Sequence, residues 1–329
     1  MDNMLDIFNG DPFSVTTLTT AINKVKPVPT QLGDSGLFPA GKGVTTTTVA
    51  IEMQEGRTRL VRPTPRGAPP SVAERKTRKT RALSIPHFPR QDVVRADEVQ
   101  NVRAFGTVST AQAVADLVVD RMAQLRADLE YTMEDARMRA LKGVIFDENG
   151  NDIDLYQFFG VTRQSLTMNF GAASFDLRGR LFDLVKALKA NDLKGVNSGG
   201  TVFCGDDFWQ ALITSKAVQS TYLNTQAAAD LRGEPTQRFQ YAGVTFVWYN
   251  GNDEVKVDAD SGIFVPNITG MFDTHYAPAP YIETVNTVGM PFYAKQRVNE
   301  DQTGVNLTVQ TNALVINTCP QGVVDLKLA

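Results

Sequence analysis

Residues 109–143, STAQAVADLVVDRMAQLRADLEYTMEDARMRALKG, decide the fold of this chain. The spacing of their apolar residues predicts one helix over 109–142, capped by Ser109, stopped by Gly143 and roughly 50 Å long. A coiled-coil dimer is the alternative reading, but small side chains near the end of the helix favour close packing against a sheet or another helix. We therefore predict a single long spine. Its apolar positions, three or four residues apart, are Val114, Val118, Met122, Leu125, Leu129, Met133, Ala136 and Ala140.

Ahead of this helix, residues 44–92 predict a long two-stranded excursion. Alternation from Val44 to Met53 indicates a strand rich in β-branched residues. A second strand is predicted over 81–88, with Leu83, Ile85 and His87 on one side, and the Pro- and Gly-rich run 63–70 separates the two. Two strands bury too little surface to be stable alone, so the excursion needs a partner surface in this chain or in another.

The segments on either side complete an α+β pattern. Residues 1–43 show little periodicity and are predicted to form an extended arm. Beyond the spine, Asn149-Gly150 predicts a tight hairpin. The rest of the chain mixes helices with strands drawn from distant parts of the sequence, which is typical of the α+β class. Further elements are predicted as a helix over 177–188, a strand over 201–204 followed by a helix, a hairpin over 239–249, and strands near 306–310 and 314–316.

Charge is distributed unevenly along the chain. Between Arg57 and Arg90, ten basic residues are opposed only by Glu74, a net +9, and the total of −3 therefore leaves −12 for the remainder. A basic arm on an acidic body is typical of nucleic-acid binding or of contact with an acidic neighbouring copy, and a solvated loop is the plain alternative. The residues that would make the inter-subunit contact, if the arm meets a neighbouring copy, are Arg57, Arg59, Arg62, Arg66, Arg75, Lys76, Arg78, Lys79 and Arg81.

Composition and motifs argue against catalysis. Two histidines and two cysteines leave zinc and triad chemistry short of parts. The stretch 36–43, GLFPAGKG, approaches a phosphate-binding loop but lacks the Ser/Thr after its Lys and leads into a strand. The oxygen-rich run 147–154 is explained better as a hairpin turn than as a calcium loop, since Phe158 stands where a closing Glu is needed. We expect no enzyme activity, no cofactor, no metal and no membrane span.

Several stretches carry a resemblance that runs nearly end to end in a consistent order. They are AINK (21–24), TPRG (64–67), ADEVQNVRAFG (96–106), RADLE (126–130), ALKG (140–143), YLNT (222–225), ETVNT (283–287) and YAKQ (293–296). With the order arm, basic hairpin, spine helix, α/β insert and returning strands, the chain resembles the major capsid proteins of tailed bacteriophages, specifically the lambda-type capsid E family.

The resemblance implies the Hong Kong-type phage capsid fold. Its parts would be an N-terminal arm (1–43), an extended β-hairpin loop (44–92), a peripheral domain with the spine helix (93–172), an axial domain (173–285) and returning strands of the peripheral domain (286–329). It implies a structural protein that assembles with itself into hexamers and pentamers around phage double-stranded DNA, without sequence-specific binding. Scaffold, portal and decoration proteins are partners of this class, and the implied location is the virion shell, assembled in the host bacterial cytoplasm. The alternative is a non-specific nucleic-acid-binding protein acting through residues 57–90.

Overall fold

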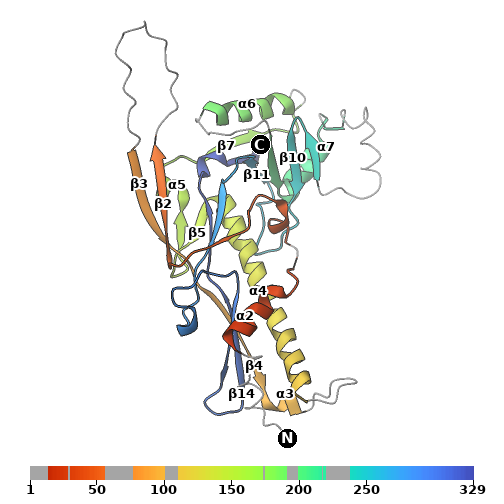
Figure 1. Ribbon diagram of the computed structural model, residues 1–329. Helices are drawn as coiled ribbons and strands as arrows, with labels where there is room; N and C mark the ends of the chain where they lie inside the picture. Colours follow the sequence, from red (N-terminus) through yellow and green to blue (C-terminus); the bar gives the residue numbers. More distant parts are fainter. Residues whose placement is uncertain are drawn as a thin grey trace, which may run out of the picture.

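The long helix predicted from the sequence organises the molecule. The computed structural model describes residues 14–28, 30–55, 77–100, 110–172, 175–190, 199–216, 218–219 and 238–329. Helix α4 (Thr110–Lys142) runs along the elongated chain and links its two ends (Figure 1). From Val118 onward, every apolar position predicted to face the core is buried. The helix is therefore confirmed, whereas the predicted cap Ser109 lies outside the described residues.

Gly143 ends the helix in the left-handed region, at φ 78°. A Cβ built on it would lie 2.3 Å from a ring carbon of Tyr156. The chain then forms the predicted hairpin of β5 (Val144–Phe146) and β6 (Asp152–Asp154), whose turn holds Gly150 at φ 82° with nothing within 4 Å of a built Cβ. The two glycines thus share a backbone conformation and differ in the space around them.

This difference makes a matched pair of variants. Gly150→Ala should cost about 1–2 kcal/mol, the strain of a left-handed alanine. Gly143→Ala should cost that amount and roughly 1–3 kcal/mol more, because Tyr156 must move. Urea unfolding of both variants measures the difference. If both lower the free energy of unfolding equally, Tyr156 moves aside without an energetic cost.

The N-terminal half of α4 packs on a three-stranded antiparallel sheet. Helix α2 (Val15–Lys24), capped by Ser14, covers the same core, to which it contributes Leu18 and Ile22. The sheet has the order β13-β14-β4, and its central strand supplies three buried aliphatic side chains. The strands are β4 (Phe88–Arg95), β13 (Tyr293–Val298) and β14 (Gly304–Thr311), and α3 (Ala96–Gln100) follows β4.

A six-stranded mixed sheet forms the other end of the molecule (Figure 1). One face is covered by α6 (Leu177–Ala190) and α7 (Asp206–Thr214), and the opposite face meets the C-terminal half of α4. Successive side chains of strands such as β8 and β10 point to opposite faces of the sheet, so these strands contribute apolar side chains to the layers on both faces. The order is β7 (Gln164–Met168), β16 (Val324–Leu328), β11 (Ser261–Pro266), β8 (Gly200–Cys204), β10 (Val244–Trp248) and β9 (Arg238–Tyr241).

The last strand lies between strands of two different predicted segments. Strand β16 pairs on one side with β7, from residues 93–172, and on the other with β11, from residues 173–285, in the six-stranded sheet. The periodicity of a short strand does not say which sheet it joins, since pairing partners come from distant sequence. Strands β13, β14 and β15 (Ala313–Asn317), earlier in the same segment, lie along α4.

The predicted strand over 81–88 is wrong, because the chain breaks there into two strands. Strand β3 (Thr77–Ser84) pairs with β2 (Thr48–Glu55) as a separate ribbon, and β4 begins at Phe88 in another sheet. Pro86 lies at the break, where a residue without an N–H cannot continue a ladder. Leu83 and Ile85 are buried as expected, whereas His87 is exposed and contacts Asn312 through Nδ1 at 2.6 Å.

A third sheet lies beside the ribbon. Its order is β1 (Lys42–Gly43), β12 (Phe272–Tyr276) and β15, with the arm contributing the edge strand β1. The base of the ribbon packs on this sheet and on α5 (Leu155–Phe159) in one apolar cluster. Three single-turn 3-10 helices complete the described elements: Gly33–Ser35, Ile282–Thr284 and Pro320–Gly322.

Candidate assembly surfaces

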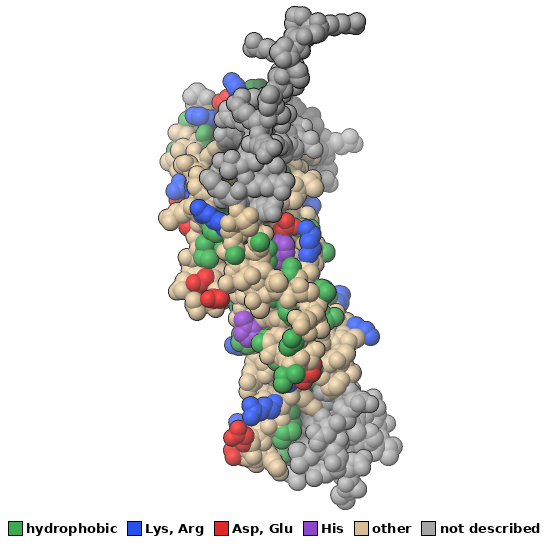
Figure 2. All heavy atoms as spheres, turned by 60° about the vertical axis from the view of Figure 1, so that its left-hand side comes forward, with side chains coloured by type: hydrophobic (Ala, Val, Ile, Leu, Met, Phe, Trp, Pro, Cys, Tyr) green, Lys and Arg blue, Asp and Glu red, His purple; other side chains and the backbone are tan. Residues whose placement is uncertain are grey.

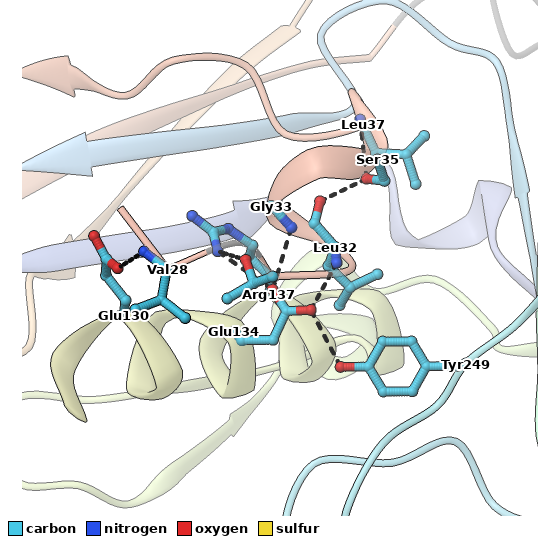
Figure 3. A network of polar contacts seen from close by, with 10 residues as sticks. Val28, Leu32, Gly33, Ser35, Leu37, Glu130, Glu134, Arg137 and Tyr249 are labelled. Carbon is cyan, nitrogen blue, oxygen red and sulfur yellow. Dashed lines mark hydrogen bonds and ion pairs between the residues drawn. The ribbon is translucent and has the colours of Figure 1, made fainter. Parts of the chain in front are cut away.

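Buried charges on α4 hold the N-terminal arm by its backbone. Glu134 is 4% exposed, and its carboxylate accepts hydrogen bonds from Leu32 N (2.6 Å), Gly33 N (3.2 Å) and the Tyr249 hydroxyl (3.2 Å) (Figure 3). Arg137 lies 3.3 Å from the same carboxylate. Burial and the Glu134 charge raise the pKa of Tyr249, which keeps the phenol protonated as a donor. The Glu134 carboxylate is therefore buried with hydrogen-bond donors at both of its oxygens.

One turn earlier, Glu130 and Arg126 repeat the arrangement. Glu130, 8% exposed, accepts from Val28 N at 2.5 Å and from Arg126 Nε at 2.7 Å. Arg126 also donates to the carbonyl oxygens of Ile22 and Val25. Buried charges on α4 therefore bind the arm at residues 22–28 and again at residues 32–33. Leaving such a buried charge without its partner would cost stability.

The same stretch of arm reaches the six-stranded sheet. Gln31 donates to Trp248 O at 2.6 Å and accepts from Asn250 N at 3.0 Å, just after β10. The arm thus connects α4 with the end of that strand. Sequence reasoning missed Arg126, Glu130 and Glu134, because their partners are backbone groups about a hundred residues away.

The structure describes only some of the predicted basic contact residues. Arg81 is exposed, and its guanidinium donates to Phe158 O and lies 5.2 Å from that ring's centre. Two more have backbones in β3, where Arg78 pairs with Gln54 and Lys79 with Met53, but their side chains are not among those described. The remaining six, Arg57, Arg59, Arg62, Arg66, Arg75 and Lys76, lie outside the described residues.

The strands of the β2–β3 ribbon are hydrogen-bonded to no other described strand. Its strands bond to each other from the pair Thr48–Ser84 to the pair Glu55–Thr77. Leu83 and Ile85 anchor its base in the core, and the ribbon rises along one edge of the molecule (Figure 1). Both outer edges of such a ribbon keep free N–H and C=O groups, which are open to pairing or to cover by another surface.

A second unusual surface lies between β12 and β13. Four large apolar side chains are exposed within residues 281–290, which we call the apolar loop: Ile282 (91%), Val285 (64%), Val288 (61%) and Met290 (43%). In the view that brings the ribbon side forward, hydrophobic side chains appear as separate patches among the other surface (Figure 2). A short segment that exposes several large apolar side chains is typical of a site that another molecule covers.

The described residues offer little for catalysis or metal binding. Among them, no group of three His, Cys, Asp or Glu side chains could hold a metal ion, and no helix is long and apolar enough to cross a membrane. Cys204 is completely buried, and burial raises its thiol pKa. Asp147 accepts from Asn149 N and Asn151 N within the hairpin turn, the role expected from the sequence.

Solved structures and curated relatives agree on the class of protein. The fold is that of tailed-phage capsid proteins: the chain aligns over its full length with 93% of the mature capsid protein of bacteriophage PhiM1, at 13% identity and a TM-score of 0.52. It is 23% identical to the major capsid protein of Salmonella phage Felix O1, with 96% of each chain covered. It is 25% identical to that of Pseudomonas phage KPP10, covering 80% of this chain and 82% of the relative.

The family is equally clear. The model of the phage major capsid protein E family matches residues 14–328, and the chain belongs to that family. The resemblance drawn from the sequence is confirmed, as is the α+β capsid fold. The protein is a structural building block of a capsid, and nucleic-acid binding as its main role finds no support among these relatives.

Proposed function

We propose that this protein forms the icosahedral head of a tailed phage or prophage by assembling with itself into hexamers and pentamers around double-stranded DNA. It performs no catalysis and needs no cofactor. Assembly would take place in the host bacterial cytoplasm, with scaffold, portal and decoration proteins as further partners. In this proposal the segments 1–43, 44–92, 93–172 and 173–285 act as arm, extended loop, peripheral domain and axial domain, and residues 286–329 are the returning strands of the peripheral domain.

The ribbon carries the proposal. Its two strands bond only to each other among the described strands, yet such a pair is marginal in water without a covering surface. A neighbouring copy supplies that surface in a ring, where the same heterologous contact repeats until it closes. The basic residues predicted between Arg57 and Arg81 would then face the acidic body of the neighbour, each exposed ion pair contributing about 0–1 kcal/mol.

A shortened ribbon tests this role. Glu55 and Thr77 are a register pair, so an Asn-Gly turn replacing residues 56–76 can close the hairpin directly. We expect a folded subunit with an unchanged thermal midpoint but at least tenfold fewer particles in negative-stain electron microscopy and sedimentation. Shells in normal yield would contradict the contact.

The nucleic-acid alternative makes the opposite prediction. If residues 57–90 served DNA binding, the isolated subunit would bind duplex DNA with an affinity that falls steeply as salt rises. The capsid proposal predicts large symmetric particles formed in the absence of DNA. Sedimentation at low and high salt, with and without duplex, separates the two.

A further inference from the structure

The apolar loop is held rigidly in a shape that keeps its apolar side chains outside. Thr284 Oγ1 donates to Ala279 O at 2.6 Å, and Thr287 Oγ1 donates to Thr284 O at 2.7 Å. Asn286 lies at φ 59°, the left-handed region that asparagine tolerates at a turn. The exposure of the loop is therefore built into its fold.

The far end of the loop is pinned just as firmly. Gly289 N donates to Val44 O at 2.9 Å, and Met290 N donates to the Tyr293 hydroxyl at 2.9 Å. A Cβ on Gly289 would lie 1.9 Å from Tyr276 O, so only glycine allows this close approach. A preorganised surface loses little conformational entropy when a partner covers it.

The charge of the loop limits what can cover it. Glu283 is the one charged residue between Ala277 and Phe292, and Lys295 pairs with it at 3.2 Å. A neutral, apolar surface has nothing to attract the phosphates of nucleic acid. It is equally unsuited to the arginine-rich segment 57–81 of a neighbouring copy, which would lose hydration without gaining partners.

The chain itself offers one surface of matching character. Among the described residues, the other exposed large apolar side chains stand singly on four different segments: Val28, Val119, Phe182 and Ile213. Only the apolar loop groups several together. In a two-fold contact the same patch of both copies faces itself, and a patch whose one charge, Glu283, is already paired with Lys295 does so with little like-charge repulsion.

We propose that the apolar loop is a homotypic contact, at which residues 281–290 of one copy pack on the same residues of another copy. The proposal rests on the proposed function, since it needs copies that assemble. It adds a second contact, chemically unlike that of the ribbon: apolar and symmetric rather than basic and heterologous. The variants below leave the ribbon intact.

Cysteine substitution tests the contact. Val285→Cys is made in a Cys319→Ser background, because Cys319 is partly exposed and could react, whereas Cys204 is fully buried. Position 285 is exposed, so the variant should fold normally. Particles and free subunits are then labelled with a maleimide and treated with a short bis-maleimide. Thr214→Cys, on the exposed side of α7, is the matched control for general accessibility.

We expect Val285→Cys to react at least tenfold more slowly in particles than in free subunits, and to yield cross-linked dimers only in particles. Equal labelling in both states would overturn the contact while leaving the proposed function standing. If the cysteine at position 285 is protected in particles but gives no cross-linked dimers, the loop is covered by a different surface and the homotypic contact is overturned. A parent chain that stays monomeric under all conditions, including with its scaffold protein present, and whose loop is freely labelled would overturn the proposed function and this contact together.

Discussion

Glu134→Ala is expected to lower the free energy of unfolding by about 3–5 kcal/mol, the cost of removing one partner from a buried ion pair. The glutamate is 4% exposed and holds two arm N–H groups, the Tyr249 hydroxyl and the Arg137 guanidinium. Without the carboxylate the two arm N–H groups and the Tyr249 hydroxyl lose this acceptor, whereas Arg137 keeps its contact with Thr30 Oγ1 at 3.3 Å. Urea unfolding measures the loss, and amide hydrogen exchange should rise first at Leu32 and Gly33.

Two further variants define the reason for that loss. Glu134→Gln keeps the side-chain volume and one acceptor oxygen, so it should lower the free energy of unfolding by less than Glu134→Ala does. Glu300→Ala removes a carboxylate that is 89% exposed and pairs with Arg297, so stability should not change measurably. Equal effects of Glu134→Ala and Glu300→Ala would mean that the arm network contributes nothing.

Phe246→Ala should also destabilise the protein by about 3–5 kcal/mol, as large-to-small changes at fully buried aromatics do. Phe246 has no exposed surface, and its ring stacks on Phe239 at 5.2 Å between centroids. It lies in the layer where β10 meets α7, so the cavity would open between sheet and helix. Differential scanning calorimetry together with urea unfolding measures the change.

Phe182→Ala is the matched control, because the same atoms are removed from a ring that is 69% exposed on α6. Its stability should stay within about 0.5 kcal/mol of the parent. A similar loss at both positions would show that an effect on the unfolded state, rather than core packing, determines the result.

The elements that the sequence predicted well are those specified by neighbouring residues. The apolar spacing of 109–142 predicted α4, since i, i+3 and i+4 positions share one helical face whatever lies opposite. Asn149-Gly150 predicted its hairpin, and Gly143 marked the helix end, because positive φ angles follow from residue type. In the hairpin over 239–249, Ala242 and Gly243 likewise turn at positive φ.

The site was less predictable because its partners are remote in sequence. A Glu at position 134 looks like a solvated residue between apolar neighbours, and only the folded arm brings Leu32 N and Gly33 N to its carboxylate. The basic residues of 57–81 were visible as a charge run, whereas the apolar loop was not singled out. Its side chains resemble ordinary core residues until the structure places them outside.

By itself, the sequence determined the α+β class, the spine helix, its tight turns and, through resemblance, the capsid family. Short-range periodicity and turn chemistry depend on residues within a few positions of one another, so they can be read in order. Only the tertiary structure decided that 81–95 splits between two sheets, that β16 joins the six-stranded sheet and that α4 binds the arm backbone. These features depend on which distant segments compete for the same hydrogen bonds and apolar surface, and that competition is resolved only when the chain folds.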